Sequence, residues 1–272
     1  MKTENFIQQN MGADKIVGRP IRLNKFKLEV KKDKKYAELL LFGDLHLGHP
    51  QSNIKKAKGM LNWALKTNTP VLLMGDLLEA GLKDSIGNSV YTQKLDPQMQ
   101  MEEVIEMLQP LADKGLIKGL HTGNHEMRIT KTTGIDISKV IARILKVPYL
   151  GYACWNMITV DKQKYGVYSE HGTGGSKFKH TKLKRALDQL AWIRSDALFL
   201  AHHHALEASR TTVQEISFRN KQVVEKKCYV VLTGGYIDWD NSYAQMYEMP
   251  PTEIGSPKVK FFSTEREIKI SF

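Results

Sequence analysis

Cysteine is scarce in this sequence, and its scarcity excludes two classes of protein. The 272 residues include only two cysteines, Cys154 and Cys228, which stand far apart. Two isolated thiols form neither a disulfide framework nor a cysteine-based zinc site. A chain of this length buries enough apolar surface to fold without disulfides. Because unpaired thiols are typical of reducing compartments, we expect a cytoplasmic protein.

Long apolar runs are also missing. The longest, such as residues 39–42, fall far short of the roughly 20 residues that a membrane-spanning helix needs. The N-terminal segment MKTENFIQQN lacks the apolar centre of a signal peptide. We therefore expect a soluble protein without a membrane partner.

Acidic residues are fewer than basic ones, so the chain carries a positive net charge. Lysine and arginine number 40, and aspartate and glutamate number 29, which gives a formal net charge of +11. This excess favours polyanionic partners, nucleic acid first, and it also suits a phosphorylated substrate. The charge can equally serve to keep the surface soluble, because net charge by itself locates no site.

Hydrophobic periodicity indicates an α/β protein whose first half alternates strands and helices and whose second half is rich in strands. Helices are expected at residues 52–67, 97–113, 136–146 and about 180–194. Strands are expected at residues 22–30, 36–42, 71–74, 116–123, 152–160, 165–170, 197–201, 215–218, 223–232, 259–262 and 267–272. The lysine-rich residues 31–35 are the expected tip of a hairpin between the first two strands. We expect a single domain, residues 1–272, in which residues 1–20 form a loosely ordered lead-in.

Three successive strands of the first half each end in a glycine followed by a polar side chain. The segments are Gly43-Asp44-Leu45-His46, Gly75-Asp76 and Gly123-Asn124-His125. Open α/β sheets place their sites at the carboxyl ends of strands, and glycine lets the chain turn sharply there. The second half adds His171 after one strand and the run His202-His203-His204 after another.

Carboxylate, amide and imidazole groups together suit divalent ions such as manganese, iron, zinc or nickel. In Asp44-x-His46 and His202-x-His204, alternate residues of an extended chain project to the same side, so each pair can reach one site. Taken singly, Asp44 and His46 could form a solvated turn, and His171 could be a core histidine. Taken together, these side chains serve no structural purpose that apolar residues would not serve better.

The motif series resembles that of the calcineurin-like metallophosphoesterases, which reads D-x-H, G-D-x-x, G-N-H-[DE], H and G-H-x-H. In this chain it stands as Asp44-Leu45-His46, Gly75-Asp76-Leu77-Leu78-Glu79, Gly123-Asn124-His125-Glu126, His171 and Ala201-His202-His203-His204. Within the family, the segment DLHLG is most similar to Mre11/SbcD-type nucleases. The resemblance implies a four-layer αββα sandwich with a dinuclear metal site at the loop edge. Ala201 replaces the usual glycine, which is tolerated if its backbone angles are ordinary.

The resemblance also implies a role for each motif residue. One metal ion would be held by Asp44, His46 and His204, the other by Asn124, His171 and His202, and Asp76 would bridge both. Manganese is the favoured metal, with iron, zinc and nickel as alternatives. The triple histidine leaves open that His203 replaces a neighbour, although the H-x-H pattern favours the outer two.

The family mechanism gives His125 and Glu126 catalytic roles. His125 would lie near the substrate as a general acid or phosphate contact, and Glu126 would steady it. Two ions about 3.5–4 Å apart can neutralise a phosphodiester and supply a bridging hydroxide at neutral pH. This hydroxide would attack phosphorus in line with the leaving oxygen.

The basic residues near the motifs suggest the substrate. Lys177 and Lys179 follow His171 and could contact a phosphate backbone, although they also fit the solvated face of an amphipathic helix. Arg128 could contact phosphate and His49 could reach the scissile group, although both could equally serve on the surface or in packing. We favour a phosphodiesterase that hydrolyses nucleic acid, DNA above all, as an endo- or exonuclease.

Two alternatives stay open. One is a phosphatase or phosphodiesterase for small or cyclic nucleotides, because the same site serves these substrates within the family. The other is a non-catalytic nucleic-acid-binding or scaffold protein on the same fold, although such a protein would not need the intact ligand set. The sequence specifies neither a protein partner nor an oligomeric state.

Overall fold

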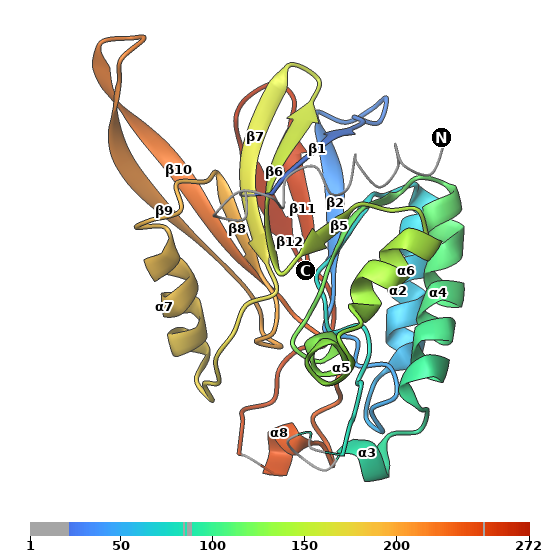
Figure 1. Ribbon diagram of the computed structural model, residues 1–272. Coiled ribbons are helices and arrows are strands. Elements are labelled where there is room, and N and C mark those ends of the chain that lie inside the picture. The colour runs from blue at the N-terminus through green and yellow to red at the C-terminus, as the bar shows by residue number, and fades with distance from the viewer. Residues whose placement is uncertain (1–21, 84, 86–88, 247) are drawn as a thin grey trace.

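Two six-stranded sheets pack face to face, and helices cover their outer sides (Figure 1). The computed structural model describes residues 22–83, 85, 89–246 and 248–272. The expected lead-in at residues 1–20 therefore lies outside the described residues.

The first sheet is built mainly from the second half of the chain. Its order is β1 (Leu23–Leu28), β6 (Ala153–Val160), β7 (Gln163–Glu170), β8 (Ala197–Leu200), β10 (Gln222–Thr233) and β9 (Leu206–Ser217). Neighbours β7 and β8 are parallel, as are β8 and β10. The carboxyl ends of β7 and β8 therefore lie at one edge of the sandwich.

The second sheet joins the first half of the chain to its C-terminal strands. Its order is β12 (Ile268–Ser271), β11 (Lys258–Phe262), β2 (Tyr36–Phe42), β3 (Val71–Leu73), β4 (Ile117–His121) and β5 (Tyr149–Gly151). Strands β2 to β5 are parallel, whereas β11 is antiparallel to both of its neighbours. The carboxyl ends of β2, β3 and β4 therefore lie together.

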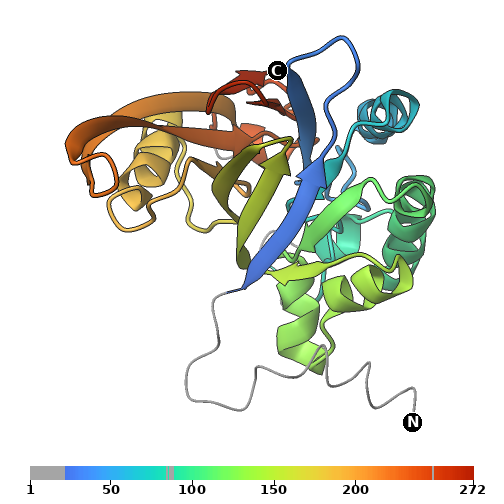
Figure 2. The ribbon, with the colours of Figure 1, turned by 90° about the horizontal axis from the view of Figure 1, so that it is seen from above.

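Helices cover both outer faces of the sandwich (Figure 2). The second sheet carries α2 (Ile54–Thr67), α4 (Pro97–Asp113), α5 (Glu126–Thr133) and α6 (Ile137–Ile144), and the first carries α7 (Lys179–Gln189). Two short helices, α3 (Ser89–Thr92) and α8 (Tyr243–Met246), lie beyond the strand ends. Local signals explain the start of α4: the Asp96 side chain, just before the helix, accepts from the amide of Met99, and Pro97 is the first helical residue.

Three apolar cores separate the layers. Strand β2 shows why, because its side chains alternate: Leu40 and Phe42 join the core under the helices, whereas Leu39 and Leu41 join the core between the sheets. A smaller core lies between the first sheet and α7 and includes Ala186. The four-layer αββα sandwich expected from the resemblance is therefore confirmed.

The expected hairpin at residues 31–35 is wrong. Strand β1 pairs in parallel with β6, whereas β2 belongs to the other sheet. The lysine-rich turn carries the chain from one sheet to the other. Turn residues indicate where a chain reverses, but the side chains buried on each strand decide its partner.

Helix α7 ends earlier than the expected residue 194. Beyond Gln189 the amides of Leu190, Ala191 and Trp192 each bond to a carbonyl three residues back, so the chain tightens into turns. The side chain of Trp192 is 69% exposed. The apolar spacing continues past the helix end because Leu190 and Ile193, in these turns, still pack against the small core beneath α7.

Strands β9 and β10 form an arm that extends beyond the sandwich (Figure 1). They pair with each other along their whole length, but β8 pairs only with Tyr229–Leu232 of β10. The arm bears the exposed side chains of Ile216, Phe218 and Val223. No helix among the described residues is long and apolar enough to span a membrane.

Candidate metal centre

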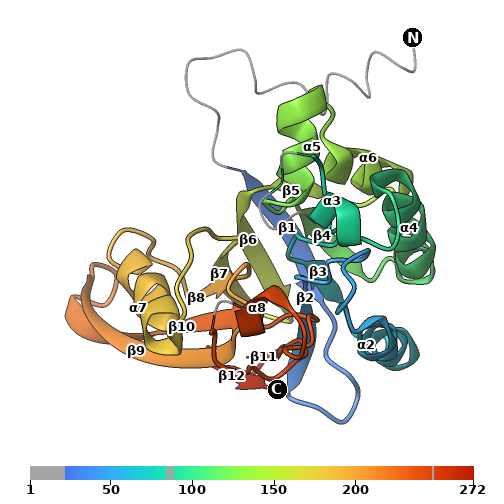
Figure 3. The ribbon, with the colours of Figure 1, turned by 90° about the horizontal axis from the view of Figure 1, so that it is seen from below.

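Five loops meet at the edge of the sandwich that Figure 3 faces. Each loop follows a strand and delivers one or two polar side chains: Asp44 and His46 follow β2, Asp76 follows β3, Asn124 follows β4, His171 follows β7, and His202 and His204 follow β8. The structure therefore brings together all seven residues expected to bind metal, from segments far apart in the sequence.

The backbone of these loops is strained at the candidate ligands themselves. Left-handed φ angles occur at Asp44 (48°), His46 (49°), Asp76 (48°), His202 (66°) and His204 (49°). Non-glycine residues rarely adopt this conformation, and where they do, the surrounding structure must hold them. Gly123 makes the close approach of two loops possible, because a Cβ there would collide with Asp76. Left-handed angles also occur elsewhere, for example at Lys146 and Lys221, but five of them fall on candidate ligands, so these loops must hold those side chains in place.

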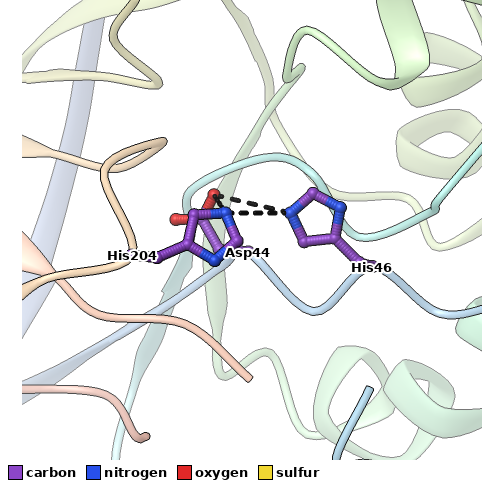
Figure 4. Close-up of side chains that lie close together, drawn as sticks. All are labelled: Asp44, His46 and His204. Atoms are coloured by element: carbon purple, nitrogen blue, oxygen red, sulfur yellow. Dashed lines mark hydrogen bonds and ion pairs between the residues drawn. The ribbon is translucent and has the colours of Figure 1, made fainter. Parts of the chain in front are cut away.

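The first ligand group consists of Asp44, His46 and His204 (Figure 4). The Nε2 atoms of the two imidazoles lie 3.2 Å apart. Asp44 Oδ1 lies 3.6 Å from Nε2 of His204 and 4.0 Å from Nε2 of His46. This oxygen is buried and accepts no hydrogen bond from any residue that the structure describes, whereas Oδ2 accepts from the amide of His202 at 3.0 Å. One carboxylate oxygen thus fixes a loop, and the other faces the imidazoles.

The second ligand group consists of Asp76, His171 and His202, with Asn124 beside them. Oδ1 of Asn124 lies 3.0 Å from Nε2 of His171 and 2.7 Å from Nδ1 of His202. Asp76 Oδ2 lies 3.2 Å from Nε2 of His171. The same oxygen lies 3.7 Å from Nε2 of His46, so Asp76 stands between the two groups. Its other oxygen accepts from the amide of His125 at 2.8 Å.

Burial keeps three of the imidazoles neutral. It lowers the pKa of His46, lowers that of His202 to about 4, and takes that of His204 well below its usual value. Glu79 fixes the tautomer of His46, because its Oε2 accepts from Nδ1 at 3.2 Å. Nε2 of His46 therefore presents a lone pair toward Asp44 and His204.

Two other candidate ligands, Asp44 and His171, carry protons where an ion would sit. Burial raises the pKa of Asp44 to about 8. Although burial opposes it, the Asp76 carboxylate raises the pKa of His171 to about 10. As an imidazolium, His171 donates from Nδ1 to the carbonyl of Met74 and from Nε2 toward Asn124 and Asp76. The site fits a pair of divalent ions for three reasons. The lone pairs of neutral imidazoles converge there, the buried Asp44 Oδ1 has no hydrogen-bond donor among the described residues, and the protons of Asp44 and His171 can be replaced by metal.

His125 lies beside this cluster and contacts Glu79 rather than Glu126. Its Nδ1 donates to the backbone carbonyl of Glu79 at 2.7 Å and lies 3.4 Å from the Glu79 carboxylate. Nε2 accepts from the guanidinium of Arg128 at 3.0 Å and lies 4.0 Å from Asp76. Burial and Arg128 lower the pKa of His125, but the Asp76 and Glu79 carboxylates outweigh them and raise it overall.

Glu126 does not steady the imidazole as expected; it fastens two loops. Its carboxylate accepts hydrogen bonds from the amides of Asp76, Leu77, Leu78 and Gly123, at 2.7–3.1 Å. The side chain is buried, and it joins the loop after β3 to the loop after β4. The position of Glu126 in the motif suggested a contact with His125. Because Glu126 begins α5, its side chain instead points toward these amides.

The expected substrate contacts differ in their position. Arg128 and His49 lie close to the cluster, and burial lowers the pKa of His49 to about 4. Lys177 is exposed in the loop before α7. Lys179, in the first turn of α7, pairs with Glu207 at 2.9 Å on the surface. The structure thus places two of these residues at the cluster and two on the flank of the molecule.

No protein-family model and no curated protein match this chain. It is similar to solved structures of Vps29. A single mutant from Entamoeba histolytica has 12% identity, covers 86% of this chain and 97% of its own, and has a TM-score of 0.38. The wild-type protein of that organism, complexed with zinc, is 13% identical. The match covers 86% of this chain and 97% of the Vps29 chain, with a TM-score of 0.34. Vacuolar protein sorting 29 from Cryptosporidium parvum is 14% identical. The match covers 88% of this chain and 98% of the other chain, with a TM-score of 0.36.

Two residues that contact the candidate ligands were not predicted from the sequence. Glu79 stands in the second motif, three residues after Asp76, and this position could have indicated a partner for a histidine. Lys182 is buried on α7 and bonds to the carbonyl of His203, and no sequence signal distinguishes it from its exposed neighbours. Ala201 is buried and is absent from the left-handed residues, so its methyl group is accommodated.

Proposed function

We propose that this protein is a dinuclear metal-dependent phosphodiesterase that hydrolyses nucleic acid, with DNA as the favoured substrate. The observation that carries the proposal is the arrangement of two ligand groups around Asp76, whose Oδ2 lies 3.7 Å from Nε2 of His46 and 3.2 Å from Nε2 of His171. A single carboxylate between two sets of imidazoles is suited to bridge two ions.

The ligand set supports manganese as the preferred metal, with iron, zinc and nickel as alternatives, because it mixes carboxylates, an amide and imidazoles. When bound, two such ions would neutralise the phosphoryl oxygens and lower the pKa of water at the site. Asp44, His46 and His204 would hold one ion. Asn124, His171 and His202 would hold the other.

His125 and Arg128 support a role in protonating the leaving oxygen. The Asp76 and Glu79 carboxylates raise the pKa of His125, which helps its imidazole to take up a proton, and its Nδ1 is anchored on Glu79. Nε2 is the atom that would donate, but Arg128 occupies it in the substrate-free protein. We infer that an arriving phosphate draws the guanidinium to itself, which frees Nε2 to carry the proton.

The charge of the chain supports a polyanionic substrate. The net charge is +11, and exposed Lys177 and Lys179 precede and begin α7, next to the loop of His171. The pair between Lys179 and Glu207 is exposed, so it contributes little stability and yields easily to a phosphate. A phosphate backbone reaching the ions could therefore continue along α7.

Hydrolysis by metal-reconstituted protein tests the proposal. Bis-p-nitrophenyl phosphate, p-nitrophenyl phosphate, and labelled single- and double-stranded DNA would be compared in manganese. We expect cleavage of the diester and of DNA by the wild type, none by Asp76→Ala, and wild-type rates for Asp240→Ala, which changes an exposed aspartate.

The substrates separate the alternatives. Cleavage of small esters alone, lost in Asp76→Ala, would replace nucleic acid by small nucleotides as the substrate class. Manganese binding without turnover of any substrate would reject an enzyme and favour a non-catalytic binding protein. Activity that persists in Asp76→Ala would reject this site.

A further inference from the structure

A buried lysine connects helix α7 to the metal centre. Lys182 faces the sandwich with 7% of its surface exposed, and its ammonium donates a 2.8 Å hydrogen bond to the carbonyl of His203. Lysine is almost never fully buried unless its charge has a partner. Here that partner is the backbone between His202 and His204, the two candidate ligands of the loop after β8.

The backbone that Lys182 contacts is strained on both sides. The φ angles of His202 and His204 are 66° and 49°, in the left-handed region. Residues keep such angles only where surrounding contacts hold the chain in place. The His203 carbonyl lies between the two, so a donor that fixes its direction restrains both ligands.

The loop has further contacts, among them the amide of His203, which donates to the carbonyl of Ala201 at 2.7 Å. The amide of His202 donates to Asp44 at 3.0 Å, and the carbonyl of Ala205 accepts from the amide of Gly234 at 2.9 Å. The contact from His202 depends on Asp44, which is itself a candidate ligand. Lys182 restrains the middle of the loop from a separate element, with no ligand as intermediary.

Helix α7 also packs against the loop that carries His171. The guanidinium of Arg185 occupies the space beside Gly174, where a Cβ would collide with it. Gly174 has a left-handed φ of 93°. The helix therefore contacts both loops of the first sheet that deliver candidate ligands. Burial and Lys179 lower the pKa of Lys182, and the Asp44 carboxylate opposes them.

We propose that Lys182 is a positioning residue: its ammonium holds the His203 carbonyl and thereby sets the His202 and His204 imidazoles for metal binding. This role rests on the proposed function, because that function makes His202 and His204 metal ligands. Loss of the ammonium releases a strained loop but leaves the two sheets intact. Metal affinity therefore falls in a protein that is still folded.

Manganese binding to metal-free protein, measured by isothermal titration calorimetry beside the thermal midpoint, tests this role. Lys182→Met removes the ammonium but retains the apolar stem, and Lys182→Arg restores a cation that can reach the carbonyl. The matched control is Lys184→Met, since Lys184 lies on the same helix, is exposed and pairs with Asp188. We expect Lys182→Met to bind manganese about 10- to 100-fold more weakly than the wild type.

Lys182→Arg should recover most of the manganese affinity, and the control Lys184→Met should bind manganese as tightly as the wild type.

Wild-type affinity in folded Lys182→Met would overturn the proposal, as would a lowered thermal midpoint with unchanged affinity, which marks a purely structural role. If Lys182→Met does not fold, Lys182→Gln takes its place with the same criteria. A wild type that binds manganese but hydrolyses nothing rejects the phosphodiesterase and leaves this comparison valid. A wild type that binds no manganese overturns both.

Discussion

Glu79 contacts three side chains that belong to different parts of the site. Its carboxylate lies 3.2 Å from Nδ1 of His46, 3.4 Å from Nδ1 of His125 and 3.8 Å from the guanidinium of Arg128. Burial raises the pKa of this carboxyl, but the two histidines outweigh it and hold the pKa below its usual range. A charged Glu79 therefore orients one candidate ligand and the candidate acid at once.

Replacing Glu79 should weaken both roles. Glu79→Gln removes the charge that fixes the His46 tautomer, and loss of such a partner typically costs 10- to 100-fold in metal affinity or activity, so we expect about that loss in manganese affinity. Calorimetry on metal-free protein measures it, with the exposed Glu106→Gln as the matched control. Equal affinities for Glu79→Gln and the control would contradict the assigned role.

The function of His125 can be separated from metal binding by the choice of leaving group. His125→Ala removes the candidate acid but none of the seven candidate ligands, so manganese affinity should stay near that of the wild type. Cleavage of an alkyl or nucleotide diester should slow by about 100- to 10,000-fold, because its leaving oxygen needs a proton. Release of p-nitrophenolate should slow much less. Equal losses for both leaving groups would exclude general-acid catalysis by His125.

At the scale of whole elements, the site depends on how the loops are fastened to one another. Glu126, the first residue of α5, accepts from four amides of the loops after β3 and β4. These loops carry Asp76 and Asn124. The Glu126 carboxylate therefore fixes the relative positions of two members of the second ligand group. No metal is needed for this restraint, because all four donors are backbone groups.

Removing this fastening should destabilise the fold itself. Glu126→Ala leaves buried amides without acceptors, and each unsatisfied group costs about 1–3 kcal/mol, so we expect the free energy of unfolding to fall by about 3 kcal/mol or more. Urea denaturation of metal-free protein measures the change. Glu126→Gln retains one acceptor oxygen and should lose less, and Glu106→Ala should stay within about 0.5 kcal/mol of the wild type. An unchanged urea midpoint for Glu126→Ala would contradict the prediction.

The sequence predicts elements better than it predicts their partners. The helix expected at residues 97–113 is found at those bounds, because Asp96, Pro97 and the apolar spacing are local signals. The partner of β1 was missed, because sheet membership depends on side chains buried by distant strands. The candidate ligands were predictable as residue types at strand ends. The contacts of Glu79 and Lys182 were not, because they depend on how separate loops pack.

At the scale of the whole molecule, the arrangement of charge links metal binding to pH. The chain is basic, yet the centre buries Asp44 and Asp76 together among histidines. Without metal, protons partly replace the ions: burial raises the pKa of Asp44 to about 8, and Asp76, against the effect of burial, raises that of His171 to about 10. At pH 7 both groups are therefore protonated, and both must lose a proton to act as ligands.

Manganese binding should therefore release protons at pH 7 and strengthen as the pH rises. Each of these pKa values lies above pH 7 in the metal-free protein, so raising the pH toward 8 removes a competing proton and increases the apparent affinity. Titrations in buffers of different ionisation enthalpy count the protons, and we expect about two per pair of ions. The Asp76→Ala substitution removes the carboxylate that raises the pKa of His171, so this pKa should return toward its usual value. The variant should therefore release fewer protons for each ion that it still binds. The exposed His180→Ala should behave as the wild type. An affinity independent of pH between 6 and 8, with no proton released, would contradict the protonation of Asp44 and His171 in the metal-free protein.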